Sequence, residues 1–182
     1  YTIETKEKKD YSANFDQNVH GISWTEDSKN IYTISDFHAR FQIYKLNLET
    51  NEIKAVTNGD HNYRSVTVVN DKLIATKQSM SMPTEIFAVD EAGKETQLSF
   101  VNKDLLDQLE LAKVEERWVK TTDGKDMLVW VIYPPHFDPN KKYPALLYCQ
   151  GGPQSSVSQF FSYRWNFQMM AANGYVVVAP NR

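Results

Sequence analysis

Apolar and polar residues alternate in short runs along the first hundred residues, and clusters of Asn, Asp, Gly or Ser separate the runs. Alternation with a period of two is typical of strands that bury one face. The sequence predicts eight short strands, at 22–24, 31–34, 41–48, 52–57, 66–69, 73–76, 85–89 and 96–99. The first part of the chain is therefore predicted to be all β.

These strands form two groups of four that repeat at an offset of 42 or 43 residues. Gln42-Ile43-Tyr44 aligns with Glu85-Ile86-Phe87, and Ala55-Val56-Thr57 aligns with Gln97-Leu98-Ser99. Four strands in about 40 to 45 residues are typical of a β-propeller blade. A plain antiparallel sandwich has similar strand spacing, but the repeated register favours two blades.

The pattern changes near residue 103. Apolar residues at helical spacing predict a short helix over 104–112 and a longer one over 160–170. Further strands are predicted at 116–120, 127–132, 145–149 and 175–179. The run 145–149 is apolar throughout, as in a strand that is buried on both faces. The final strand, helix and strand form a β-α-β unit, so this part is predicted to begin an α/β sheet.

Composition and charge exclude several classes of protein. The 182 residues include 20 basic and 23 acidic side chains, for a net charge of −3, whereas nucleic-acid and membrane-surface proteins show a basic excess. No apolar run approaches the roughly 18 residues of a membrane span. The single cysteine, Cys149, excludes an internal disulfide and a Cys-based zinc cluster. We expect no metal and no cofactor.

The candidate chemistry lies at Gly151-Gly152, directly after the strand predicted at 145–149. Glycine lets the backbone approach a ligand closely because it has no Cβ. In α/β-hydrolases this position supplies a donor to the oxyanion hole. Taken alone, the glycine pair is equally compatible with a plain tight turn. The G-x-G-x-x-G fingerprint of dinucleotide-binding proteins is absent.

Two sets of motifs resemble a known family. Residues 24–32 (WTEDSKNIY) and 56–59 (VTNG) resemble the W-S-P-D-G-K and L-T-x-G blade of TolB-like and peptidase-associated propellers. Later motifs follow in order at 122–124 (TDG), 130–135 (WVIYPP), 142–147 (KYPALL), 150–154 (QGGPQ), 173–177 (NGYVV) and 180–182 (PNR). This series resembles the start of the catalytic domain in the prolyl oligopeptidase family of serine peptidases, in the dipeptidyl-peptidase and acylaminoacyl-peptidase branch.

The resemblance implies an architecture and an activity. Residues 1–102 would be the C-terminal blades of a β-propeller, and residues 103–182 the N-terminal part of an α/β-hydrolase domain. The family hydrolyses peptide bonds near the N-terminus of short peptides with a Ser-Asp-His triad. No G-x-S-x-G nucleophile elbow occurs in the chain, so no catalytic residue is expected within it. The triad is expected after Arg182, and the chain alone is expected to be inactive.

The resemblance also suggests roles for individual residues. Gln150 stands where relatives commonly have His or Tyr, and we expect Gln150, Gly151 and Gly152 to border the oxyanion site. Cys149 is predicted to be a buried structural thiol. The aromatic residues of 160–167 are predicted to lie mostly in a helix core. The four histidines, His20, His38, His61 and His136, are predicted to be ordinary turn, surface or loop residues.

Other interpretations stay open at this point. The same architecture occurs in esterases and in inactive homologues, and a non-enzymatic propeller binding module is a third alternative. Short peptides are the expected partners, and the whole protein can form a homo-oligomer. Resemblance to bacterial peptidases suggests export, for example to a periplasm.

Overall fold

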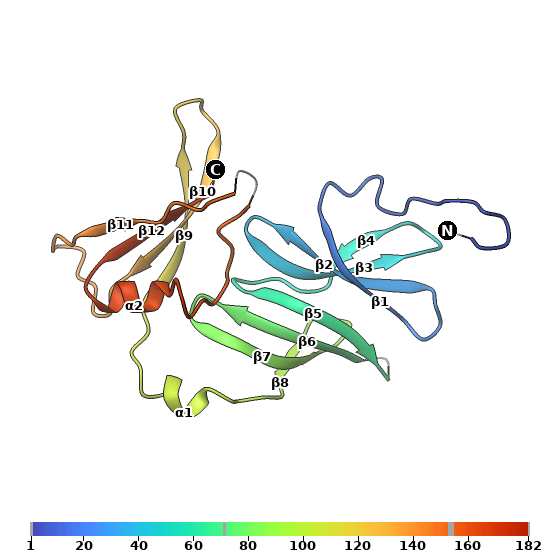
Figure 1. Cartoon of the computed structure of the whole chain (residues 1–182), viewed down its shortest axis with the longest axis horizontal. Coiled ribbons are helices and arrows are strands. Elements are labelled where there is room, and N and C mark those ends of the chain that lie inside the picture. The colour runs from blue at the N-terminus through green and yellow to red at the C-terminus, as the bar shows by residue number, and fades with distance from the viewer. Residues whose placement is uncertain (1, 71, 153–154, 182) are drawn as a thin grey trace.

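The computed structural model describes residues 2–70, 72–152 and 155–181, and in this part of the chain the strands form three four-stranded sheets (Figure 1). Two of the sheets are antiparallel meanders in which each strand pairs with the next along the chain. The first holds β1 (Val19–Trp24), β2 (Asn30–Phe37), β3 (Arg40–Asn47) and β4 (Ile53–Ala55), and the second β5 (Asn62–Val69), β6 (Lys72–Ser79), β7 (Met82–Val89) and β8 (Glu95–Gln97). The prediction of two four-stranded blades is confirmed.

The two blades pack face to face through an apolar core. Ile43 on β3 is fully buried, and Ile34 on β2 and Leu73 on β6 of the other blade are almost so. The cluster also contains Tyr32, Tyr63, Ala75 and Val89, with Phe41, Val56, Val66 and Val68 packed around it. Alternating apolar residues of both sheets therefore meet between the blades, as in sheet-on-sheet packing generally.

The third sheet has mixed strand directions. It contains β9 (Lys113–Lys120), β10 (Asp126–Tyr133), β11 (Ala145–Leu147) and β12 (Val176–Pro180), in the order β11-β12-β10-β9. β9 and β10 form an antiparallel hairpin, whereas β11 and β12 are parallel and are connected through α2 (Phe167–Ala172). The predicted β-α-β unit is confirmed. The chain thus combines a partial propeller with the first strands of an α/β-hydrolase sheet.

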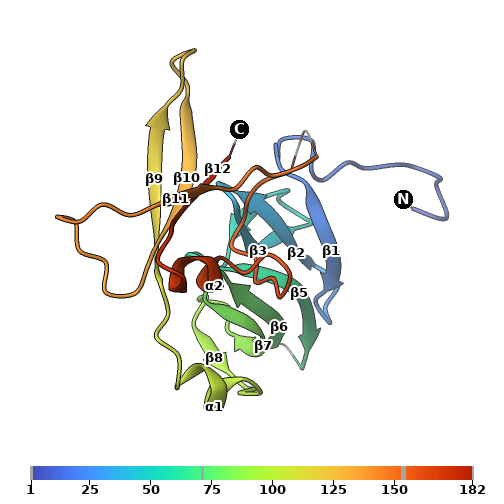
Figure 2. The same cartoon turned by 60° about the vertical axis from the view of Figure 1, so that its left-hand side comes forward.

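One face of this third sheet shares a core with the blades. Trp130 and Ile132 on β10 and Val177 on β12 are fully buried beside Phe167 of α2. Met80, from the turn between β6 and β7, joins the same cluster. Figure 2 shows α2 and the chain that leads into it lying between the third sheet and the blades.

Both predicted helices are shorter than expected. The helix predicted at 104–112 is the single turn α1 (Lys103–Leu106), because Leu105 and Leu109 are exposed and no core supports a longer helix. The helix predicted at 160–170 begins only after Asn166, whose side chain accepts a hydrogen bond from the Met169 amide. No helix of the described residues is long and apolar enough to cross a bilayer.

Three predictions of burial are wrong. The strand predicted at 145–149 is only β11, which lies at the sheet edge and is exposed along its length. Cys149, just beyond it, is also exposed rather than buried. Tyr163 and Trp165 are exposed rather than part of a helix core, because they lie in the irregular segment before α2, where the Ser162 hydroxyl accepts from the Trp165 amide.

Candidate active site

The glycine turn lies at the carboxyl end of β11. Tyr148 continues the pairing with β12 by donating from its amide to the Val178 carbonyl at 2.8 Å, and the chain leaves the sheet after this residue. Gln150, Gly151 and Gly152 follow after Cys149, and both glycines are exposed. In open α/β sheets, ligands bind beyond the carboxyl ends of parallel strands. The turn therefore occupies the end of the sheet at which a ligand is expected.

Ser155 fixes the orientation of the turn. Its hydroxyl donates to the Gly151 carbonyl at 2.7 Å, and the Gly152 carbonyl lies 3.3 Å from the same oxygen. In a planar trans peptide the C=O and the following N–H point in opposite directions. The Gly152 N–H is consequently directed away from Ser155, and among the described residues it donates to none. Pro153 and Gln154, the rest of the motif, lie outside the described residues.

The two glycines differ in what requires them. Gly152 has a φ of +76°, a conformation that other residues adopt only with strain. Gly151 does not have a left-handed φ, and a Cβ built on it meets no atom within 4 Å. Neither backbone conformation nor packing among the described residues therefore requires glycine at position 151.

Gln150 is held by neighbours on both sides of its amide. The Tyr148 hydroxyl donates to its Oε1 at 2.9 Å, and its Nε2 donates to the Ser155 hydroxyl at 3.3 Å. The side chain thus braces the turn from within. The Nε2 group has two N–H donors, so one donor is left after the bond to Ser155.

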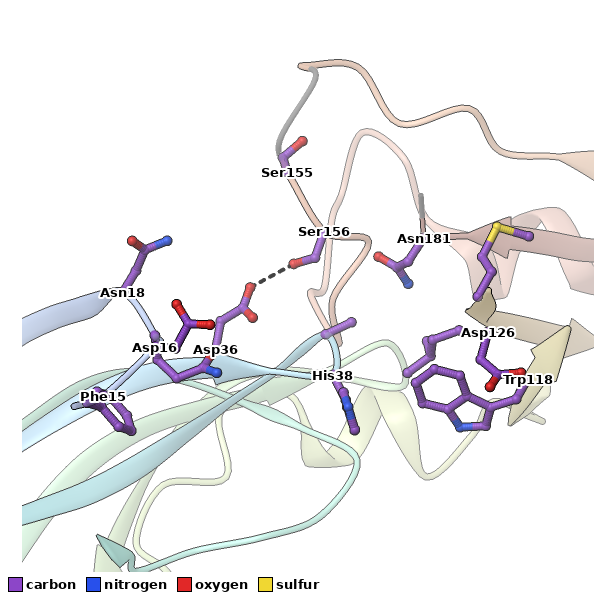
Figure 3. Close-up of a pocket in the computed structure, with 14 residues that line it drawn as sticks. Phe15, Asp16, Asn18, Asp36, His38, Trp118, Asp126, Ser155, Ser156 and Asn181 are labelled. Carbon is purple, nitrogen blue, oxygen red and sulfur yellow. Dashed lines mark hydrogen bonds between the residues drawn. The ribbon is translucent and has the colours of Figure 1, made fainter. Parts of the chain in front are cut away.

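A cavity of about 720 Å³ lies beside this turn, between the first blade and the third sheet. Ser155 and Ser156 line it from one direction, and Asp36 and His38 of the first blade from another (Figure 3). Further lining residues are Phe15, Asp16, Gln17, Asn18, Ala39, Trp118, Asp126, Met127, Leu128 and Asn181. Of the residues that the structure describes, three carboxylates and no Lys or Arg line the cavity, and they give it a negative potential.

The segment after the glycine turn is hydrogen-bonded both to the first blade and to the third sheet. Ser156 donates to the Asp36 carboxylate at 3.0 Å, as Figure 3 shows. The next residue, Val157, is fully buried, and the Asn181 side chain bonds to both its amide (2.6 Å) and its carbonyl (3.2 Å). Trp130 donates to the same carbonyl at 2.9 Å. Ser156 is thereby fixed relative to the first blade, and Val157 is fixed relative to the third sheet.

Arg40 forms the main charged contact between the first blade and the third sheet. Its guanidinium pairs with Glu116 on β9 and with Asp60 at 2.7 Å, and it lies 4.7 Å from the ring centre of Trp130. Burial acts to raise the pKa of Glu116, but hydrogen bonds from Arg40 and Trp118 outweigh it, so that the pKa is lowered overall. Glu116 is therefore held in its charged form.

The tight turn from β2 to β3 lies at the cavity rim and is unusual in sequence. His38 and Ala39 both have positive φ, as in the two-residue turns that join antiparallel strands, yet neither is Gly or Asn. The His38 ring stacks on Phe37 and meets the edge of Trp118 at 5.1 Å between ring centres. Such backbone strain often occurs at functional sites.

The histidines only partly match the prediction. His20, His38 and His136 are exposed as expected, and His136 pairs with Glu110 at 2.9 Å. His61 lies in the turn between β4 and β5, as expected, but its side chain is mostly buried, 3.4 Å from the Glu95 carboxylate, so it is not a surface residue. Among the described residues, no three His, Cys, Asp or Glu side chains are arranged to hold a metal ion.

The residues that sequence reasoning selects, Gln150, Gly151 and Gly152, contact Ser155 at the edge of the cavity but do not line it, and sequence reasoning misses the residues that do. Asp36, Ser155 and Ser156 belong to no motif, and their role arises from contacts 120 residues apart in the case of Asp36 and Ser156. The sequence gives one indication of Asp36: it is a charged residue at the end of an alternating strand, two positions after Ile34.

Comparison with known proteins gives a consistent result, although no family model matches the chain. Over 181 residues the chain is 44% identical to dipeptidyl-peptidase 5 of Porphyromonas gingivalis, covering 99% of this chain and 26% of that protein. Over 153 residues it is 46% identical to dipeptidyl-peptidase 5 of Porphyromonas endodontalis, covering 84% of this chain and 22% of that protein. The chain thus spans about a quarter of the length of the curated relatives it matches.

Solved structures agree on the fold. An acylaminoacyl peptidase in complex with Z-Gly-Gly-Phe-chloromethyl ketone matches with a TM-score of 0.82 and 23% identity, over 97% of this chain and 27% of that one. A likeness at this identity concerns the fold alone. With the identity to the Porphyromonas peptidases, it places this chain in the prolyl oligopeptidase family of peptidases, on the dipeptidyl-peptidase and acylaminoacyl-peptidase branch.

Proposed function

We propose that this chain is part of a longer serine exopeptidase, in which it joins two propeller blades (residues 1–102) to the start of an α/β-hydrolase domain (residues 103–182). The enzyme would release short N-terminal units from peptides. The relatives named dipeptidyl-peptidase 5 support the reaction class. The fact that two blades cannot close a propeller of four or more supports the longer protein.

In this proposal the glycine turn forms one side of the oxyanion hole. A substrate carbonyl oxygen would accept a hydrogen bond from the Gly152 N–H as negative charge develops on it during attack by the serine. Ser155 would keep that N–H directed outward, and the open space beside Gly151 would admit the substrate. The observation that most supports this role is the hydrogen bond from Ser155 to the Gly151 carbonyl, because it orients the Gly151–Gly152 peptide whose N–H would bind the oxyanion.

The negative potential of the neighbouring cavity fits a substrate with a free amino terminus. The cavity is lined by Asp16, Asp36 and Asp126, and its volume of about 720 Å³ is within the range of small-ligand sites. Ser, His and Asp of the triad would come from outside the described residues. The residues of this chain would orient the substrate and stabilise charge.

The full-length protein provides the test. We expect it to hydrolyse dipeptidyl aminomethylcoumarins and to be labelled covalently by a serine-directed fluorophosphonate. Labelling with hydrolysis of simple esters but not of peptide bonds would indicate an esterase, and neither labelling nor hydrolysis would indicate an inactive homologue. In the active enzyme, a Gln150→Ala variant should lose kcat if the Gln150 amide contributes directly; a variant that keeps full kcat would restrict the role to the glycine backbone.

A further inference from the structure

A second cavity, of about 330 Å³, lies between the two blades at the strands that begin each sheet, and Ser158 and Phe160 of the segment after the glycine turn line it from the other direction. Its walls include the apolar side chains of Ile34, Phe41 and Phe160. A volume of this size suits a ligand of a few residues. It is separate from the first cavity, with which it shares no lining residue.

Arg64 is directed to this cavity by an irregularity in β5. Tyr63 pairs with Lys77, and Ser65 pairs with Thr76, so Arg64 is an extra residue with no partner on β6. Such β-bulges re-aim a side chain and are common beside binding sites. Arg64 lines the cavity, is exposed, and forms no ion pair with any carboxylate of the described residues. Its guanidinium therefore has its donors available.

The other blade supports a specific role for this position. In β1 the register shifts between His20 and Ser23, so that the first blade has a bulge one repeat, 43 residues, earlier. The residue that corresponds to Arg64 there is Gly21, which has no side chain. Both blades thus have the bulge, but only the second blade has a charged side chain, Arg64, at this position.

Gln78 adds a second unused donor. Its side chain is 4% exposed and lines the same cavity. Its Oε1 accepts from the Thr84 hydroxyl at 3.2 Å, but its Nε2 donates to none of the described residues. That nitrogen is not among the fully enclosed polar atoms without a partner. This accessible N–H, which no described residue accepts, is therefore a donor that a ligand in the cavity can use.

The charge of the two cavities is opposite. Within the described ranges, no Asp or Glu lines the second cavity, which holds Arg64, whereas three Asp and no Lys or Arg line the first. His20, which packs against Phe41 at 5.6 Å between ring centres, also lines the second cavity, as His38 lines the first, so the histidines do not alter this difference. A planar guanidinium with a neighbouring amide N–H matches the two oxygens of a carboxylate.

We propose that Arg64 and Gln78 bind a carboxylate of the peptide substrate, with the side chain of its terminal residue packed against Phe41 and Phe160. This inference rests on the proposed peptidase function and adds to it a preference for short peptides with a free C-terminus. A side-chain carboxylate would offer the same chemistry, so the experiment separates the two sources.

The test measures binding to the full-length protein by calorimetry. The probe is Ala-Ala-Ala-Phe with a reduced, uncleavable bond between the second and third residues, as the free acid and as the C-terminal amide. A third probe is an amide with Glu in place of Phe. We expect the acid to bind about tenfold more tightly than the amide, because the amide cannot form the charged pair. A Glu amide that binds as tightly as the Phe acid would assign the site to side-chain carboxylates.

Matched variants identify the residues responsible. Arg64→Ala should reduce the ratio of acid to amide affinity to about one, Arg64→Lys should leave an intermediate ratio, and Gln78→Glu should reduce it by repulsion. Arg117→Ala removes the same charge from β9, where Arg117 pairs with Glu115, and should leave the ratio unchanged. An equal loss of affinity for acid and amide in Arg64→Ala, or no acid preference in the wild type, would overturn the inference.

The same protein samples separate this inference from the proposed function. Hydrolysis of a neutral dipeptidyl aminomethylcoumarin, which has no carboxylate, tests the peptidase proposal alone and is measured on the wild type and on Arg117→Ala. Absence of that hydrolysis together with a retained, Arg64-dependent acid preference would refute the peptidase proposal and leave the carboxylate site standing. Hydrolysis without any preference for the acid would support the peptidase proposal and refute the carboxylate site.

Discussion

The two blades contact each other in a different way from the blades and the α/β sheet. Between the blades, whole strand faces meet, and side chains such as Ile43 and Leu73 are almost fully buried. Between the blades and the sheet, few apolar side chains meet, and polar groups of one segment bond to successive parts of the blades. Ser156 contacts Asp36, Ser158 contacts Asn62, and Gln159 accepts from the Met80 amide.

This difference indicates where the molecule is rigid and where it can be adjusted. Burial of apolar area stabilises the blade pair without depending on any one bond. The junction instead depends on individual hydrogen bonds and on the Arg40 cluster, each worth about 1 to 3 kcal/mol. Both cavities lie along this junction, so small changes there would alter binding before they alter folding.

The largest loss of stability is expected from Ile43→Ala. The side chain is fully buried between the blades, and its removal leaves a cavity, so we expect the free energy of unfolding to fall by about 2–5 kcal/mol. Ile86 holds the aligned position in the second blade but is 42% exposed. Ile86→Ala should therefore cost much less. Similar losses at both positions in urea denaturation would contradict the account of the blade interface.

Gly93→Ala tests the same interface at a turn. Gly93 has a φ of +81°, and an added Cβ would lie 2.1 Å from the Val56 carbonyl oxygen. We expect a loss of about 2–4 kcal/mol from strain and overpacking together. Gly124 also has a φ of +81° but has open space around it, so Gly124→Ala reports the strain alone. If both variants lose the same stability, the contact with Val56 is unimportant.

Arg40→Ala tests the junction. It leaves the Glu116 and Asp60 carboxylates without their shared partner, and we expect a loss of about 1–3 kcal/mol, smaller than at Ile43. Limited proteolysis should become faster within residues 103–112, between the blades and the sheet, while cleavage between the blades should not change. Faster cleavage at residues 56–62 would show instead that Arg40 supports the blade pair.

The smallest expected effect is the pH dependence of the same contact. Because the pKa of Glu116 is lowered on folding from its ordinary value of 4.5, its contribution is present above about pH 4.5 and is lost as the pH falls through the lowered value. Glu116→Gln should remove this part of the acid dependence in unfolding curves measured from pH 6 to pH 3. An unchanged curve would show that the pair does not contribute.

The sequence predicts the repeated parts of this fold better than the contacts between them. Period and alternation locate both blades, because each strand is specified by its own residues and Gln42 and Glu85 occupy equivalent buried positions on β3 and β7. Whether Cys149 is buried depends instead on which elements cover β11, and the local sequence does not indicate this. The bulge at Arg64 and the bond from Ser156 to Asp36 likewise arise from pairing and packing. Export and oligomeric state stay predictions.

The central claim is that the turn at Gly151-Gly152 is kept clear so that a substrate can reach the Gly152 N–H. The most direct measurement is kcat of Gly151→Ala in the full-length enzyme, because a Cβ at this position meets no atom of the described residues within 4 Å and should leave the unfolding midpoint unchanged. We predict a loss of kcat of about a hundredfold, as for removal of one oxyanion-hole donor. A correctly folded variant with wild-type kcat would contradict the claim.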